Sequence, residues 1–89
     1  MKKTVLITGT SSGFGRETAR HFAKQGWNVI ATMRSPGAEQ ELTGLQNVLV
    51  NRLDVQDGQS IAESIQAGVA RFGRIDALIN NAGFGLFGL

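Results

Sequence analysis

The chain has 89 residues and a formal net charge of +2, from nine basic and seven acidic side chains. It has no cysteine and one histidine, which excludes a disulfide framework and a Cys/His zinc site. Apolar residues make up 42% of the chain, too large a share for intrinsic disorder at so low a net charge. The cations are scattered, with only Lys2 and Lys3 adjacent, so the sequence shows no nucleic-acid-binding patch.

No apolar run approaches the ~20 residues that a membrane-spanning helix needs. The apolar run that follows Lys2 and Lys3 extends only from Val5 to Ile7, which is too short for a secretory signal. We therefore expect a soluble, cytoplasmic protein. The length allows one domain at most, and we take residues 1–89 as a single unit.

The expected elements alternate in type along the chain. Short runs of β-branched residues predict strands, and apolar residues at spacings of three and four predict helices. The expected strands cover 3–8, 27–33, 48–53 and 75–80, and the expected helices cover 13–25, 38–45 and 60–72. Gly26 and Gly73 are expected to end the first and third helices. This alternation predicts an α/β fold with a parallel sheet covered on both faces.

A glycine-rich segment follows the first expected strand and opens the first helix: Thr8-Gly9-Thr10-Ser11-Ser12-Gly13-Phe14-Gly15. Gly9 permits a sharp turn, Gly13 lets backbone N–H groups approach a diphosphate, and Gly15 lets the helix pack closely. The helix N-terminus offers unpaired N–H groups and the positive end of its dipole to the anion. The segment therefore indicates a phosphate-binding turn. A plain glycine-rich turn is the alternative interpretation.

Polar groups of the same segment add donors to this turn. Thr10, Ser11 and Ser12 offer hydroxyl groups, and Phe14 offers its backbone N–H while its ring is expected in the core. No Gly-Lys-Ser/Thr sequence follows, which excludes a P-loop.

Three motifs in chain order carry a resemblance to a known family. The spacing Thr-Gly-x-x-x-Gly-x-Gly from Thr8 to Gly15 resembles the glycine motif of the short-chain dehydrogenase/reductase family. Asp54-Val55 after the third strand and Asn80-Asn81-Ala82-Gly83 after the fourth are similar to two further motifs of that family. The resemblance covers almost the whole chain. It implies a partial Rossmann fold, with a four-stranded parallel sheet in the order 3-2-1-4 that stops after strand four.

The resemblance also implies a nicotinamide-dinucleotide site. Asp54 would accept a hydrogen bond from the adenine amino group, and Val55 would add backbone contacts. Asn81, Ala82 and Gly83 would lie along the ribose and nicotinamide, and the Asn81 amide would also tie neighbouring strands together. The alternatives are that Asp54 only caps a turn and that Asn81 is purely structural.

The end of the second strand bears on the choice of cofactor. A carboxylate there would bond the ribose 2′-hydroxyl of NAD. In this chain Met33 stands where the NAD-type members of the family have that carboxylate, and Arg34 follows. An arginine can bind a 2′-phosphate through two hydrogen bonds, which favours NADP over NAD. Ser12, where many NADP-preferring members carry a second cation, argues against NADP, and Arg34 as a solvated loop cation is the alternative.

The proton-transfer residues of the family are not in this chain. The family reduces carbonyls or oxidises alcohols with a Tyr-x-x-x-Lys motif and a serine, and this chain contains no tyrosine. We therefore assign no catalytic residue and expect the N-terminal cofactor-binding part of an NADP(H)-dependent short-chain oxidoreductase, inactive alone. The alternatives are a non-catalytic nucleotide-binding or interaction module, or another Rossmann-like class such as a methyltransferase.

The remaining expectations concern packing and the surface. In the implied order the fourth strand is an edge strand that carries Leu78, and an apolar edge predicts self-association. His21 is expected on the surface without a catalytic role, and Trp27 is expected to pack rather than to contact a ligand. Glu17 and Arg20 are expected to form an exposed helical ion pair.

Overall fold

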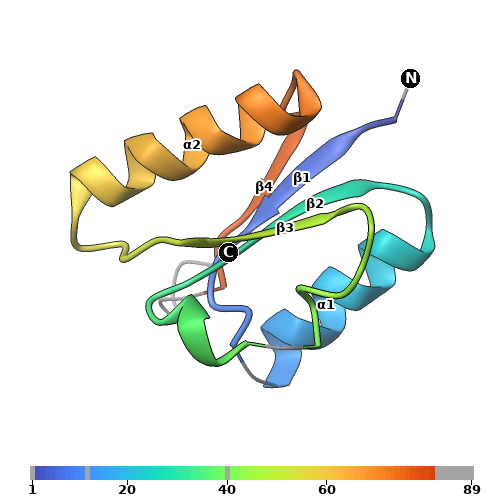
Figure 1. Ribbon diagram of the computed structural model, residues 1–89, viewed down its shortest axis with the longest axis horizontal. Helices are drawn as coiled ribbons and strands as arrows, with labels where there is room; N and C mark the ends of the chain where they lie inside the picture. The colour runs from blue at the N-terminus through green and yellow to red at the C-terminus, as the bar shows by residue number, and fades with distance from the viewer. Residues whose placement is uncertain (1, 12, 40, 82–89) are drawn as a thin grey trace.

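The computed structural model describes residues 2–11, 13–39 and 41–81. A central sheet lies between two helices, one on each face (Figure 1). The elements in chain order are β1 (Thr4–Ile7), α1 (Gly13–Lys24), β2 (Asn28–Met33), the 3₁₀ helix η1 (Pro36–Ala38), β3 (Val48–Arg52), α2 (Gly58–Phe72) and β4 (Ala77–Ile79).

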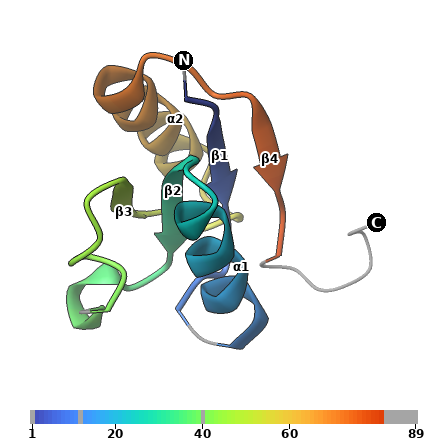
Figure 2. The same cartoon turned by 90° about the vertical axis from the view of Figure 1, so that its right-hand side faces the viewer.

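The sheet confirms the expected fold class and strand order. Its four strands are parallel and lie in the order β3-β2-β1-β4. In the register, Leu6 of β1 lies between Ile30 of β2 and Leu78 of β4. Figure 2 shows β4 at one margin of the sheet, next to β1. Because all strands run the same way, their carboxyl ends meet at one edge, where the loops that follow them gather.

The core lies on both faces of β1 and β2. Val5 and Ile7 of β1 pack in one cluster with Ala19 of α1, while Leu6 of β1 and Ile30 of β2 pack in the other. Ile61 and Phe72 of α2 lie against the second cluster. Successive residues of a strand face opposite sides, so strands buried on both sides need a nearly continuous apolar sequence. The paired clusters hold the sheet that supports the loops at its carboxyl edge.

Both helices end where glycine was expected to stop them. Gly26 after α1 has φ +91°, and Gly73 after α2 has φ +83°, a left-handed conformation that favours glycine. The second of these helices begins before the expected residue 60. Asp57 caps its N-terminus by accepting a hydrogen bond from Gln59 N at 3.1 Å.

The expectation of a helix over residues 38–45 is wrong. The described residues of this segment form only the end of η1 and then a series of turns. The Glu39 carboxylate accepts a hydrogen bond from Leu42 N at 2.8 Å, the N–H group that an α-helix would direct to the carbonyl of residue 38. The Leu42 side chain is fully buried in the core beside α1. Burial of this leucine and the carboxylate cap therefore outweigh the helix-forming residues.

Four further side chains lie where the sequence places them. His21 is exposed, and Trp27 is half-buried with its ring 5.0 Å from that of Phe22 in an edge-to-face arrangement. Glu17 and Arg20 form the expected exposed ion pair, with 3.3 Å between Oε2 and Nη1. Among the described residues, no helix is both long enough and apolar enough to cross a membrane.

Candidate functional site

An open groove of about 700 Å³ lies at the carboxyl edge of the sheet. The segments that follow all four strands line it: Gly9, Ser11, Gly13, Phe14, Met33, Arg34, Ser35, Leu53, Asp54, Val55, Gln56 and Asn81. Most of the predicted site residues are in this set. A larger open groove, of about 880 Å³, lies beside β3 and contains none of them. In parallel α/β sheets, ligands bind at the carboxyl edge, so the smaller groove is the candidate site.

The glycine-rich segment forms the expected sharp turn from β1 into α1. Gly9 has φ +68° and Gly13 has φ +56°, a region that favours glycine. A Cβ atom at Gly15 would meet the Gly9 carbonyl oxygen and would lie 2.7 Å from Asn81 Nδ2. Gly15 therefore lets the first turn of α1 approach the loop closely, and the space in front of Gly13 stays open.

Thr10 does not face the groove, so the prediction that its hydroxyl adds a donor there is wrong. The residue is fully buried, and both its N–H and its Oγ1 donate to the carbonyl oxygen of Thr32, at 3.1 and 3.0 Å. Thr32 Oγ1 in turn donates to Ile7 O at 2.8 Å. Thr10 thus fastens the loop to β2, while the exposed Ser11 remains in the groove lining.

The ring of Phe14 is not in the core, which corrects the expectation from the sequence. Its side chain is 79% exposed and lines the groove. The buried residues of α1 are Gly15 and Ala19, and Phe14 does not lie on this buried face of the helix. The structure therefore places an aromatic surface beside the glycine-rich turn.

Two asparagines after β4 fasten this strand to the loop after β1. Thr8 Oγ1 donates to Asn80 Oδ1 at 2.9 Å and accepts from Asn81 N at 2.8 Å. Asn81 Nδ2 donates to Gly9 O at 3.4 Å. The prediction that the Asn81 amide ties neighbouring strands together is confirmed. The sequence assigned nothing to Asn80, although Thr8 and Asn80 directly follow the paired residues Ile7 and Ile79.

Asp54 and Val55 lie in the turn after β3, on the groove wall. Asp54 Oδ1 accepts from Gln56 N at 3.0 Å, so the carboxylate caps a turn. Asp54 N donates to Ser60 Oγ at 2.9 Å, which fastens the turn to α2. Val55 is 42% exposed and offers an apolar surface beside the carboxylate.

Met33 ends β2 at the groove, and Arg34 follows it. The last residue of the strand is a methionine that is buried in the core, and it offers no carboxylate to the groove. Arg34 is exposed, and its guanidinium makes no hydrogen bond or ion pair with residues 2–11, 13–39 or 41–81. The groove therefore contains a cation whose donors face solvent, available to an anionic ligand.

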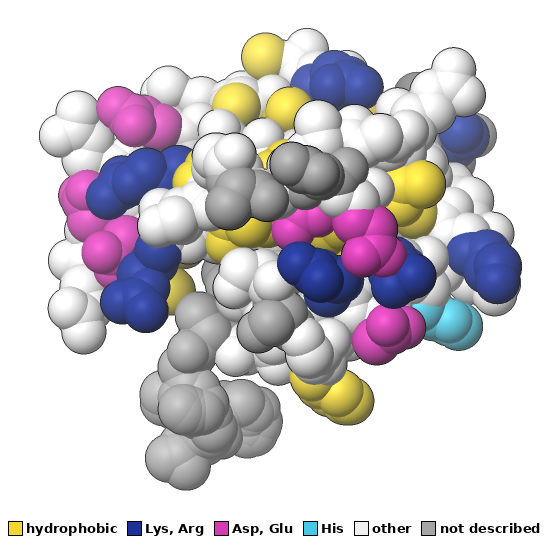
Figure 3. All heavy atoms as spheres, turned by 60° about the horizontal axis from the view of Figure 1, so that its bottom comes forward, with side chains coloured by type: hydrophobic (Ala, Val, Ile, Leu, Met, Phe, Trp, Pro, Cys, Tyr) yellow, Lys and Arg dark blue, Asp and Glu magenta, His cyan; other side chains and the backbone are white. Residues whose placement is uncertain are grey.

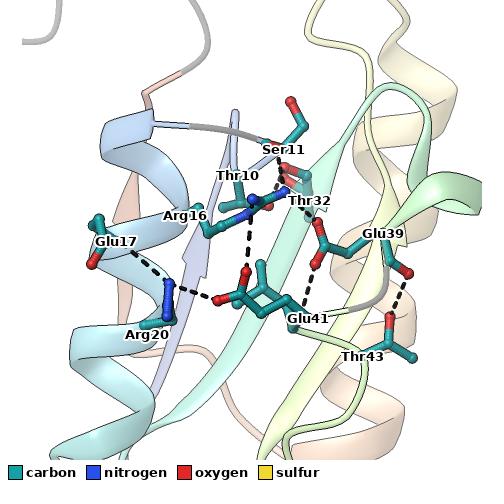
Figure 4. A network of polar contacts seen from close by, with 10 residues as sticks. Thr10, Ser11, Arg16, Glu17, Arg20, Thr32, Glu39, Glu41 and Thr43 are labelled. Atoms are coloured by element: carbon teal, nitrogen blue, oxygen red, sulfur yellow. Dashed lines mark hydrogen bonds and ion pairs between the residues drawn. The ribbon is translucent and has the colours of Figure 1, made fainter.

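The structure adds a charged network that the sequence did not predict (Figure 4). Arg16 on α1 donates to Ser11 O at 2.6 Å and pairs with Glu39 at 3.1 Å. Arg20 pairs with Glu41 at 2.6 Å. Figure 3 shows basic and acidic side chains side by side on one face of the molecule. No sequence pattern indicated these pairs, because they depend on the fold of a segment that was expected to be helical.

The pKa of Glu39 reflects this setting. Burial by itself would raise it, but hydrogen bonds from Leu42 N and from Arg16 outweigh the burial and leave the pKa below its ordinary value. The Glu39 side chain is only 2% exposed. The carboxylate therefore stays ionised beneath the surface, paired with Arg16.

Three predicted site residues, Ser12, Ala82 and Gly83, lie outside the described residues. Within the described part of the chain, no cluster of three or more histidine or acidic side chains could hold a metal ion. The site that the structure describes consists of a glycine turn, hydroxyl and amide groups, one carboxylate, one cation and the apolar surfaces of residues such as Phe14 and Val55.

The chain belongs to the short-chain dehydrogenase family, whose sequence pattern matches residues 3–88. Sulfoacetaldehyde reductase 2 of Chromohalobacter salexigens is 42% identical over 97% of this chain and 36% of its own length. The NADP-dependent 3-hydroxy acid dehydrogenase YdfG of Shigella flexneri is 42% identical over 92% of this chain and 34% of its own length. The chain thus spans about a third of the length of these relatives.

Solved structures show the same fold. A 3-ketoacyl-(acyl-carrier-protein) reductase from Brucella melitensis, complexed with NADH, superposes with a TM-score of 0.84 at 36% identity. The match covers 93% of this chain and 35% of that protein. ElxO with NADP bound superposes with a TM-score of 0.81 at 40% identity, over 97% of this chain and 37% of that protein.

Proposed function

We propose that this chain is the NADP(H)-binding part of a short-chain oxidoreductase that interconverts carbonyls and alcohols. The observation that carries the proposal is Arg34, an exposed cation in the groove that follows the buried Met33 at the end of β2 and has no partner among the described residues. A carboxylate at this end of the strand would select NAD and repel a 2′-phosphate, whereas an arginine would bind that phosphate. Of the two ligand-bound relatives, one contains NADH and the other NADP, so the choice between the cofactors has to be argued from residues of this chain.

The residues present fit a nicotinamide dinucleotide. The diphosphate would lie at the N-terminus of α1, beside Ser11 and the open space in front of Gly13. The 2′-phosphate would lie against Arg34 and Ser35, which share the groove wall. Together these groups supply hydrogen-bond donors for both phosphate positions.

The other two walls would hold the remaining parts of the dinucleotide. The adenine would lie against Asp54 and Val55, and the ribose and nicotinamide would extend toward Asn81. The family resemblance assigns Ala82 and Gly83 to the same part of the site. The dinucleotide supplies the hydride, and this chain supplies binding and orientation.

Proton transfer is not assigned to this chain, because its 89 residues include no tyrosine. A positioned proton donor contributes about 10²- to 10⁴-fold to rate. We therefore expect this chain to bind the cofactor without reducing a carbonyl by itself. The same absence also fits the second candidate, a nucleotide-binding module without catalysis.

Fluorescence titration of the 89-residue chain with NADPH and NADH tests the cofactor. We expect tighter binding of NADPH, and we expect Arg34→Ala to weaken it about tenfold or more, since a charge-assisted hydrogen bond contributes roughly 1.5–3 kcal/mol. NADH binding should change little. Arg71→Ala is the matched control, because Arg71 is exposed on α2 and does not line the groove. Equal affinity for both nucleotides, unchanged by Arg34→Ala, would remove the basis for NADP.

A further inference from the structure

The starting observation is the position of Arg16 between two segments that line the groove. Its guanidinium Nη2 donates to Ser11 O at 2.6 Å and to Glu39 Oε1 at 3.1 Å, and Nη1 lies 3.8 Å from Glu41 Oε1. Ser11 belongs to the glycine turn, whereas Glu39 and Glu41 belong to the segment after β2. One side chain of α1 therefore connects the two segments (Figure 4).

Glu39 anchors Arg16 to the segment that follows β2. Its side chain is 2% exposed, and both oxygens accept hydrogen bonds, Oε1 from Arg16 and Oε2 from Leu42 N at 2.8 Å. Leu42 is fully buried in the core. A buried carboxylate that loses its one cation is strongly destabilised, so the pair resists separation.

The segment that Glu39 anchors begins at the groove. Arg34 and Ser35 line the groove directly, and Glu39 N donates to Pro36 O at 3.0 Å across the single turn of η1. Neither Arg16 nor Glu39 lines the groove. Any effect of the pair on a ligand must therefore pass through the positions of Ser11 and Arg34.

We infer that Arg16, paired with the buried Glu39, is a positioning residue that sets the separation between the glycine turn and Arg34. It thereby determines the preference for a dinucleotide that carries a 2′-phosphate. This inference rests on the proposed function. Arginine binds phosphate in a directional, two-pronged geometry, so a shift of the loop weakens that contact more than it weakens contacts to a ligand without the phosphate.

The test measures NADPH and NADH affinity for four variants: Arg16→Met, Arg34→Ala, the double variant, and Arg20→Met. We expect Arg16→Met to weaken NADPH binding about tenfold, the equivalent of one charge-assisted hydrogen bond, and NADH binding less than about twofold. In the Arg34→Ala background, Arg16→Met should not weaken NADPH binding further, because the Arg34–phosphate contact through which Arg16 acts is already absent.

Arg20→Met is the matched control. Arg20 is on the same helix, carries the same charge and also pairs with Glu41, but it contacts neither Ser11 nor Glu39. We expect its affinities to match those of the unsubstituted chain. A loss of NADPH affinity equal to that in Arg16→Met would show a general charge effect and overturn the inference.

Folding of each variant is checked by circular dichroism. If Arg16→Met does not fold, Glu39→Gln takes its place, because it keeps the shape of the side chain and removes the charge that holds Arg16. It should shift the NADPH/NADH preference in the same direction.

Four further results contradict the inference. Equal weakening of NADPH and NADH would show a merely structural role. An undiminished effect in the Arg34→Ala background would show that Arg16 does not act through Arg34. If the unsubstituted chain bound neither nucleotide, the proposed function would fail together with the inference. If Arg34→Ala abolished the preference for NADPH but Arg16→Met did not, the inference would fail and the proposed function would remain.

Discussion

At the scale of single residues, Asp76 joins the start of β4 to the start of β1. Its Oδ2 accepts from Thr4 N at 2.8 Å, and its N–H donates to Thr4 O at 2.8 Å. Arg74 holds the same carboxylate, with Nη2 2.6 Å from Oδ1. Hydrogen bonds from Arg74 and from Thr4 N keep the pKa of Asp76 below its ordinary value of 3.8. The ionised carboxylate therefore stabilises the folded state.

This lowered pKa predicts a pH dependence. The contribution of Asp76 is fully present above about pH 3.8 and is lost as the pH falls through the lower pKa of the folded state. We expect Asp76→Asn to be less stable at pH 7 and to lose less stability between pH 7 and pH 3, measured by urea unfolding. Glu63→Gln, at an exposed position of α2, is the control and should leave the acid profile unchanged. An Asp76→Asn profile parallel to that of the unsubstituted chain would contradict this origin of the acid sensitivity.

At the same scale, the sequence predicted the groove better than it predicted individual side chains. Gly9, Gly13 and Arg34 line the groove, as the motif and the strand end indicated. Thr10 and Phe14 could not be placed, because the exposure of a loop side chain depends on partners elsewhere in the fold. Thr10 finds the Thr32 carbonyl, whereas Phe14 lies next to the buried face of α1 and not on it.

At the scale of elements, α2 lies close to the sheet. Ser64 Oγ donates to Arg52 O at 2.7 Å, and Ser60 Oγ accepts from Asp54 N at 2.9 Å. One turn after Ser64, a Cβ atom at Gly68 would collide with Cδ1 of Ile30. Small side chains thus allow the helix to approach the sheet and to hold the turn that carries Asp54.

Gly68→Ala should therefore destabilise the chain by about 1–3 kcal/mol, the usual cost of overpacking a core. Ile30→Val should recover part of that loss in the double variant, because it removes the colliding Cδ1 atom. Gly58→Ala is the control at the start of the same helix, where a Cβ atom meets nothing within 4 Å. The stabilities of the unsubstituted chain, Gly68→Ala, the double variant and Gly58→Ala are measured by thermal unfolding followed by circular dichroism. A Gly68→Ala variant as stable as Gly58→Ala would show that the helix moves away at little cost.

Element types and order were largely predictable, since the periods of strands and helices differ and each strand here contains an apolar run. The segment over 38–45 was not, because its conformation follows from one carboxylate bonded to Leu42 N and from one buried leucine. Helix propensity is a weak preference that such tertiary contacts override.

At the scale of the whole molecule, β4 pairs with β1 on one side only within the described residues. Leu78 of this edge strand is 66% exposed. It lines a shallow hollow of about 230 Å³ together with Leu6, Leu53 and Ile65, among others. An apolar surface next to unpaired backbone groups favours association with another strand.

We expect the 89-residue chain to self-associate at micromolar concentration, as light scattering would show. Leu78→Lys should shift it toward the monomer, because a charge at a strand edge opposes pairing. Leu45→Lys is the control, since Leu45 is 37% exposed in the turn before β3, away from this edge. A strictly monomeric unsubstituted chain at that concentration would rule out association through β4.

The bonds that join Thr8 and Gly9 to Asn80 and Asn81 have a consequence for how the protein is made. They connect positions 72 and 73 residues apart. During synthesis on the ribosome, the glycine turn therefore emerges 72 residues before the asparagines that fasten it. Under the proposed function, we expect a nascent chain arrested before residue 80 to gain less protection from the cofactor than one that includes both asparagines.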